Sequence, residues 1–251
     1  MKSFYGKGPD YSYWNGCSGG GRQGLMLAQR YPDAYDGIAA GAPGLYTNEL
    51  LSSMQWPQQV MSMYGYPHGC EIDAIVAASV TECDPLDGVT DGIISDTEAC
   101  LEAFDPFSLV GSSVNCDDAG SQREVEISEA AATVVRNVWD GIRSADGKFS
   151  WFGFTPGTGL TTNADGVAGT NCSSGTCVGA PYHLGAEWVL YFVTKDPKFD
   201  FTNLTHEEFD ELVHQGNIYD SFVSTSDPDL SRFRDAGGKL ITYHGLVCFP
   251  L

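Results

Sequence analysis

Basic residues are scarce in this sequence. It has 13 lysines and arginines against 33 aspartates and glutamates, a formal net charge of −20 at pH 7. Proteins that bind nucleic acids or anionic membranes neutralise phosphates with lysine and arginine. We therefore expect neither nucleic acid nor a membrane surface as a partner. No hydrophobic run approaches the roughly 20 apolar residues that span a bilayer, so no membrane-spanning helix is expected either.

The short motifs of nucleotide-binding and zinc-binding proteins are also missing. There is no Gly-x-x-x-x-Gly-Lys-Ser/Thr loop, and the eight cysteines form no paired Cys-x-x-Cys motifs. Cysteines and two glycosylation acceptors, Asn171 and Asn203, favour an oxidising compartment instead. Residues 1–7 carry no apolar segment of a secretory signal. Two alternatives follow: the chain is cytoplasmic, or its true beginning is missing.

A glycine-rich segment separates two patterns of different period. An alternating aromatic run precedes Gly16-Cys-Ser-Gly-Gly20, and apolar residues at helical spacing follow it up to Arg30. A Gly-x-Ser-x-Gly pattern between strand and helix is typical of the nucleophile elbow of α/β-hydrolases. In this interpretation Ser18 is the nucleophile, and the amide of Gly19 points toward a developing oxyanion. The competing interpretation is a glycine-rich connection without chemistry.

The surrounding segments predict how the chain is organised. A short apolar run at residues 35–43 predicts a buried strand parallel to the strand before Ser18. The next convincing core strand is at residues 239–244, after a short helix that ends at a glycine pair. We predict an α/β fold: an incomplete α/β-hydrolase core with a large inserted lid domain. The predicted parts are residues 1–45 with the elbow, residues 46–225 as the lid, and residues 226–251 as the return to the core.

The expected lid is mainly helical. Propensity and periodicity predict helices at residues 48–63, 71–80, 126–139 and 205–214, with Ser128 as a candidate cap in the third segment. A loop or short hairpin is expected at residues 144–162. Residues 185–193 fit either a helix or a strand.

An acidic loop lies between Cys83 and Cys100. It contains four aspartates and two Asp-Gly steps but no basic residue. Clustered carboxylates without a cation repel one another, so a bound calcium ion is an economical explanation. The spacing is not that of an EF-hand. The alternative is a solvated acidic turn. A disulfide between the two flanking cysteines would hold the loop, and a second short disulfide-closed loop is expected at residues 172–177.

Three segments resemble the fungal tannase and feruloyl esterase family. They are the stretch from Tyr11 around Ser18 to Ile38, the loop Cys83-Asp-Pro-Leu-Asp-Gly-Val-Thr-Asp-Gly-Ile-Ile94, and the stretch from Asp227 to Gly245. The resemblance implies a secreted serine carboxylesterase that cleaves galloyl or feruloyl esters through an acyl-enzyme. Its substrates would be small phenolic esters or esters linked to a plant polymer. The sequence does not indicate the oligomeric state.

The resemblance also assigns roles to residues. Ser18 matches the nucleophile, and Cys17 matches a cysteine that pairs with one beside the catalytic histidine. Structural calcium would be bound by side chains of Asp84, Asp87 and Asp91 and by carbonyls of Val89 and Ile93. Cys83 and Cys100 match a disulfide around that loop, and Cys70–Cys116 and Cys172–Cys177 are expected as further pairs.

The chain departs from the family pattern near its end. Cys248 stands where the triad aspartate is expected, and the segment with the catalytic histidine is absent. The five histidines present are expected to be surface or packing residues. The chain therefore resembles the middle of a longer protein, truncated at both ends and with doubtful activity of its own. The alternative function is a non-catalytic calcium-binding fragment or interaction module.

Overall fold

The computed structural model describes residues 1–118, 121–161, 166–173, 175–200 and 202–245. The described residues divide into two compact units, one formed by residues 1–48 together with residues 218–245, the other by Glu49–Asn217. The change of unit thus falls at residue 49 rather than the expected 46, and the return at residue 218 rather than 226. Cys248 lies outside the described residues.

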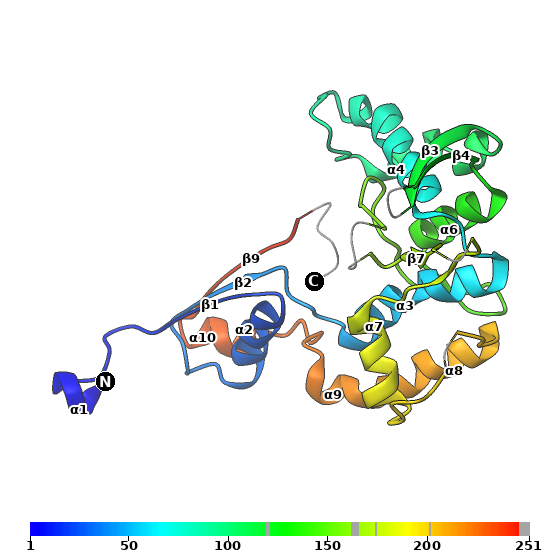
Figure 1. Cartoon of the computed structure of the whole chain (residues 1–251). Helices are drawn as coiled ribbons and strands as arrows, with labels where there is room; N and C mark the ends of the chain where they lie inside the picture. The colour runs from blue at the N-terminus through cyan, green and yellow to red at the C-terminus, as the bar shows by residue number, and fades with distance from the viewer. Residues whose placement is uncertain (119–120, 162–165, 174, 201, 246–251) are drawn as a thin grey trace. The chain divides into compact units, whose positions relative to one another are not determined.

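A parallel three-stranded sheet organises the first unit (Figure 1). Its order is β1-β2-β9, so β2 is central and pairs in parallel with both neighbours. The predicted parallel pairing around Ser18 is confirmed, with Tyr13 opposite Gly37 and Cys17 opposite Gly41. The elements of this unit are α1 (Lys2–Tyr5), β1 (Tyr13–Cys17), α2 (Gly19–Arg30), β2 (Gly37–Gly41), α9 (Asp220–Val223), α10 (Ser231–Asp235) and β9 (Lys239–Tyr243).

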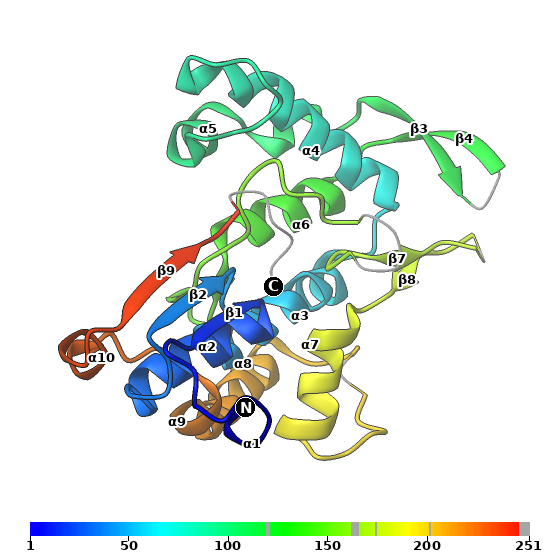
Figure 2. The same cartoon turned by 90° about the vertical axis from the view of Figure 1, so that its left-hand side faces the viewer.

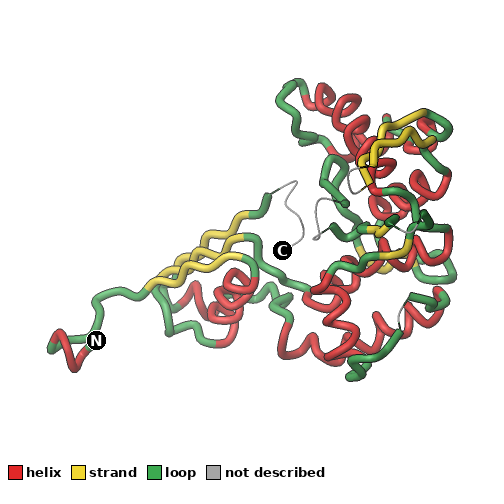
Figure 3. The backbone as a smooth tube through the Cα atoms, viewed as in Figure 1, coloured by secondary structure: helices red, strands yellow, loops and turns green. Residues whose placement is uncertain are grey.

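One face of this sheet is covered and the other is open. Ile38 and Ala40 of β2 are buried against Leu25 and Ala28 of α2, and Phe233 of α10 completes the core. Figures 1 and 3 show α2 and α10 on this same side of the strands. Side chains that alternate to the opposite face stay exposed, including Tyr13, Ile241 and Tyr243. The covered face thus fixes the strand that leads into residue 18.

The second unit is mostly helical (Figures 2 and 3), and its described residues include three small antiparallel strand pairs. Its helices are α3 (Thr47–Tyr64, which begins in the first unit), α4 (Gly69–Cys83), η1 (Asp84–Asp87), α5 (Thr97–Ala103), η2 (Pro106–Leu109), α6 (Glu129–Asp140), α7 (His183–Glu187), η4 (Trp188–Val193, a π-helix) and α8 (His206–Gly216). Its strands are β3 (Ser113–Asp118), β4 (Ser121–Glu126), β5 (Ile142–Arg143), β6 (Phe149–Trp151), β7 (Thr170–Asn171) and β8 (Val178–Gly179). A short helix, η5 (Asn217–Tyr219), spans the return to the first unit.

The core of the second unit forms where α4 packs against α6. Ile72 and Ile75 of α4, and Val134 and Val138 of α6, are 0% exposed. The middle of helix α3 is buried, including the polar side chains of Gln58 and Gln59. The Gln58 amide nitrogen donates to the Gly169 carbonyl at 3.0 Å, and the Gln59 amide nitrogen donates to the Leu204 carbonyl at 2.9 Å. In the part of the chain that is described, no helix has the length and apolar character needed to cross a bilayer.

Candidate active site

Ser18 occupies the turn between β1 and α2. Its φ of 59° and ψ of −120° belong to a backbone conformation that residues with a Cβ rarely adopt. The Ser18 N–H donates to the Gly41 carbonyl at the end of β2 at 2.9 Å, and its own carbonyl accepts from the Arg22 N–H at 2.9 Å. The turn is therefore held from the sheet side and from the helix side. Such stored strain is typical of functional positions.

The glycines around Ser18 are required by close backbone approaches. A Cβ on Gly16 would lie 2.5 Å from the Gly20 carbonyl oxygen, and one on Gly21 would lie 2.3 Å from the Gly41 carbonyl oxygen. Only residues without a side chain let β1 and β2 come this close to the first turn of α2. The Trp14 indole N–H adds a bond to the Gly20 carbonyl at 2.9 Å. The sequence thus builds a tight strand–turn–helix and not a slack loop.

The hydroxyl of Ser18 is not used to cap the helix. A serine at the N-cap position usually accepts a hydrogen bond from an amide of the first turn. Ser18 is the N-cap of α2 but makes no such side-chain bond, and its side chain is half-buried. The helix N-terminus offers unpaired amides and a positive dipole end. The space around Gly19 is open, since a Cβ built there would meet no atom within 4 Å.

Side chains of α2 hold the returning chain in the first unit. The Arg22 guanidinium donates to the Val223 carbonyl at 2.6 Å, and Arg30 donates to the Ser221 carbonyl at 2.7 Å. The Gln29 amide nitrogen donates to the carbonyls of Thr225 and Asp227 at 2.7 and 2.8 Å. The segment before α10 is therefore fixed to the same helix that carries Ser18 at its start. These hydrogen bonds could not be predicted from the sequence, because the acceptors are backbone carbonyls about 200 residues away along the chain.

Among the described residues of the first unit, no histidine is hydrogen-bonded to the Ser18 hydroxyl. His244, after β9, is exposed, and its Nδ1 pairs with the neighbouring Gly245 carbonyl at 3.1 Å. His206 pairs through Nε2 with the Arg143 carbonyl at 2.6 Å and contacts the ring of Trp56. His183 and His214 belong to α7 and α8. The expectation that these are packing or surface residues agrees with these contacts for His206 and His244.

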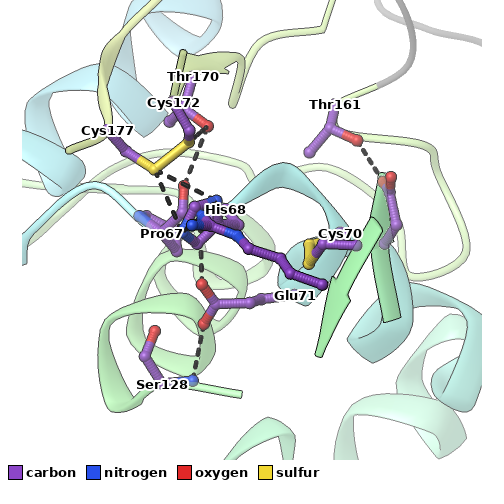
Figure 4. Close-up of a disulfide and its surroundings, with 12 residues drawn as sticks. Pro67, His68, Cys70, Glu71, Ser128, Thr161, Thr170, Cys172 and Cys177 are labelled. Atoms are coloured by element: carbon purple, nitrogen blue, oxygen red, sulfur yellow. Dashed lines mark hydrogen bonds between the residues drawn. A yellow bond between two sulfur atoms is a disulfide. The ribbon is translucent and has the colours of Figure 1, made fainter. Parts of the chain in front are cut away.

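His68 lies in the second unit, beside a disulfide (Figure 4). Its ring contacts the Arg123 guanidinium, and its Nδ1 lies 3.5 Å from the Cys177 sulfur. Its backbone N–H donates to Glu71, whose other oxygen accepts from the Ser128 N–H at 2.7 Å. Glu71 is only 3% exposed. Its two carboxylate oxygens connect the start of α4 to the start of α6 through these hydrogen bonds. The sequence suggested Ser128 as a cap but not this buried carboxylate.

The acidic loop between Cys83 and Cys100 is folded around its own carboxylates. Asp84, 6% exposed, accepts through Oδ1 from the amides of Asp91 and Gly92 at 3.1 and 3.0 Å. Asp87 accepts from the amides of Val89 and Ser95 at 2.8 and 3.2 Å. The bond from Val89, and then those from Ser95, lower the pKa of Asp87, so it is ionised at neutral pH.

The donor set of this loop fits a hard cation. It consists of oxygen atoms only, and no basic side chain between the cysteines competes for them. The side chains of Val89 and Ile93 are 57% and 41% exposed, so these two residues are not placed for core packing. Among the described residues, however, the only three His, Cys, Asp or Glu side chains with ligand atoms within 4.8 Å of one another are His68, Cys172 and Cys177. The calcium site therefore stays a prediction.

Three disulfides join the described cysteines. They are Cys70–Cys116, Cys83–Cys100 and Cys172–Cys177, the same pairs that the resemblance implied. Cys83 and Cys100 close the acidic loop, and both are buried. Cys17, next to the strained serine, is exposed and has a free thiol.

Comparison with known proteins places these features in a family. The family model described as "Tannase and feruloyl esterase" matches residues 1–247. A "Probable feruloyl esterase" of Arthroderma benhamiae is 38% identical over 248 residues, which is 98% of this chain and 44% of that protein. The "Tannase" of Aspergillus oryzae is 28% identical, over 97% of this chain and 47% of that protein.

Solved structures give the same result. A tannin acyl hydrolase from Aspergillus niger superposes with a TM-score of 0.82 at 28% identity, over 98% of this chain and 46% of that one. Feruloyl esterase B from Aspergillus oryzae superposes with a TM-score of 0.74 at 28% identity, over 98% and 46% of the two chains. The chain thus spans less than half the length of these relatives.

Proposed function

Because the chain belongs to the tannase and feruloyl esterase family, we propose that it acts in a carboxylic ester hydrolase with Ser18 as the nucleophile. The substrates are esters of phenolic acids, with galloyl or feruloyl groups. The first unit is part of an α/β-hydrolase core, and the second is its inserted lid. The observation that carries this proposal is the backbone of Ser18, held at a φ of 59° at the start of a helix while its hydroxyl caps nothing.

The proposed reaction uses this geometry in two ways. The Ser18 oxygen attacks the ester carbonyl carbon while a base takes the hydroxyl proton; the ester C–O bond then breaks, and the alcohol leaves with that proton as an acyl-enzyme forms. Water attacks the acyl-enzyme, which releases the phenolic acid and restores the Ser18 hydroxyl. The negative charge that develops on the carbonyl oxygen is stabilised by the Gly19 amide at the N-terminus of α2. A donor of this kind contributes roughly 10²–10³-fold to the rate in other serine hydrolases.

A second candidate function is a non-catalytic calcium-binding or interaction module. It is favoured by the absence of a histidine or carboxylate bonded to the Ser18 hydroxyl among the described residues of the first unit. A serine needs a positioned base to become a nucleophile. Under the first proposal that base is a histidine held by a carboxylate, which this chain must bring to Ser18 or obtain from the rest of a longer protein.

Structural calcium belongs to both candidate functions. Side chains of Asp84, Asp87 and Asp91 and carbonyls of Val89 and Ile93 would hold the ion. It would neutralise neighbouring carboxylates and stiffen the loop closed by Cys83 and Cys100, with no part in the chemical steps. We further propose that the protein is secreted, because its disulfides suit an oxidising compartment.

Hydrolysis of methyl ferulate and methyl gallate tests the proposed activity. The purified chain and the Ser18→Ala variant are compared, with calcium present and the fold checked by circular dichroism. We expect acid release by the parent chain that is lost in Ser18→Ala. If a folded chain shows no Ser18-dependent release, hydrolysis by this chain alone is rejected. If that chain still melts at a lower temperature after chelation, the calcium-binding module is the function that remains. An unchanged melting temperature after chelation would reject the calcium site.

A further inference from the structure

Asn203 and Asn171 are both exposed asparagines with a hydroxyl residue two positions later. Exposure therefore does not distinguish them, but their backbones do. We propose that Asn203 is a site of N-linked glycosylation, whereas Asn171 stays unmodified. This inference rests on the proposed secretory route, but its test supplies that route and so does not depend on the esterase activity.

The modification transfers an oligosaccharide from a lipid pyrophosphate donor to the asparagine side chain. A bond forms between Nδ2 and C1 of the first sugar, and the bond from C1 to the pyrophosphate oxygen breaks. Lipid pyrophosphate leaves, and Nδ2 gives up one of its two protons. The remaining N–H can still donate one hydrogen bond. The acceptor motif, Asn-x-Ser/Thr, requires a surface segment in a protein that passes through the secretory pathway.

The surroundings of Asn203 accommodate this change. It lies in a turn before α8 and outside any strand. Its Nδ2 donates to near neighbours, the Asp200 carboxylate and the Thr202 hydroxyl, both at 3.3 Å. One of these weak bonds survives when a proton is replaced by a sugar. Asn203 also lines a surface pocket of about 640 Å³, which leaves room for the first sugar.

The surroundings of Asn171 oppose it. Asn171 belongs to β7 and pairs with Val178 of β8. Its side-chain oxygen accepts from the Ser173 N–H at 3.1 Å, which folds the motif back on itself. The middle residue, Cys172, is bonded to Cys177. The strand pair and the disulfide hold the Asn171 motif in one rigid conformation. The Asn203 motif lies outside any strand and contains no cysteine; its side chains make local contacts, and its Leu204 carbonyl accepts from the Gln59 amide nitrogen at 2.9 Å.

Thr205 offers matched variants that separate the modification from folding. Its hydroxyl caps α8 by accepting from the Glu208 N–H at 3.2 Å, and the Glu208 carboxylate accepts from the Thr205 N–H at 2.8 Å. Aspartate is as good an N-cap residue as threonine or better, but it destroys the acceptor motif. Thr205→Asp therefore keeps the helix start and removes the glycosylation site. Thr205→Ser keeps both.

The test is expression of the full chain with a cleavable leader in a yeast secretory host. Intact mass is measured before and after peptide N-glycosidase, which converts a glycosylated asparagine to aspartate that peptide mapping detects. We expect a glycan on residue 203 in the parent, in Thr205→Ser and in Asn171→Gln. We expect none there in Thr205→Asp or Asn203→Gln. Thr205→Asp and the deglycosylated parent should have the same melting temperature, which shows that the variant is folded. An unmodified Asn203 in the parent, or equal modification of Asn171, would overturn the proposal.

Discussion

The backbone strain at Ser18 predicts an unusual stability order for two substitutions. Ser18→Ala removes the hydroxyl but keeps the Cβ that opposes a φ of 59°, whereas Ser18→Gly removes both. A positive φ costs a residue with a Cβ about 1–3 kcal/mol. Glycine loses about 0.4–1 kcal/mol through the greater freedom of its unfolded chain. The difference favours Ser18→Gly over Ser18→Ala by about 1 kcal/mol, the reverse of the order in an ordinary helix or strand.

Thermal unfolding measures this order directly. For a protein of this size, 1 kcal/mol corresponds to a shift of about 2–4 °C in melting temperature. Scanning calorimetry of both variants in the same buffer, with calcium present, resolves such a shift. We expect Ser18→Gly to melt above Ser18→Ala. An equal melting temperature, or a higher one for Ser18→Ala, would refute the strained turn on which the nucleophile elbow depends.

Three further changes have defined outcomes. Gly21→Ala places a Cβ 2.3 Å from the Gly41 carbonyl oxygen and should lower the free energy of unfolding, measured in urea, by about 1–3 kcal/mol. The control is Gly20→Ala, whose Cβ would meet no atom within 4 Å; it should not lower the free energy of unfolding. Replacing Cys83 and Cys100 by serine opens a disulfide of sequence separation 17 and should cost about 3 kcal/mol, whereas retained stability would argue against a closed acidic loop. Burial raises the pKa of Asp73, and the hydrogen bond from Thr161 partly offsets this, so its contribution to stability is present below the unfolded pKa and lost as pH rises through the folded pKa. The free energy of unfolding of Asp73→Asn should therefore rise relative to that of the parent between about pH 4 and neutral pH. A difference in unfolding free energy that stays constant over this range would contradict the prediction.

Local patterns carried most of what the sequence predicted. The strand–turn–helix around Ser18 could be read because its glycines and its change of period lie within 20 neighbouring residues. Predicted helices near residues 48–63, 71–80 and 205–214 correspond to α3, α4 and α8 for the same reason. Ser128 accepts from the Ala131 N–H as a cap should.

Features that depend on distant partners could not be read in this way. The β3–β4 hairpin was not predicted, because its strands are rich in polar residues, and Cys116 is buried through its bond to Cys70. Residues 185–193 fitted a helix or a strand, and the structure has α7 followed by a π-helix. The buried Gln58, Gln59 and Glu71 gain their roles only when distant backbone groups reach them. The positions of the cysteines along the chain suggested the Cys83–Cys100 and Cys172–Cys177 loops, whereas the Cys70–Cys116 pair came only from the family resemblance.

Reaction of the folded chain with a fluorophosphonate probe tests the central claim that Ser18 is a presented nucleophile. Peptide mapping locates the adduct, and Ser12→Ala serves as a control serine variant in the same unit. The account predicts an adduct on Ser18 in the parent and in Ser12→Ala, and none in Ser18→Ala. A folded parent without an adduct, or equal labelling of Ser18→Ala, would contradict it.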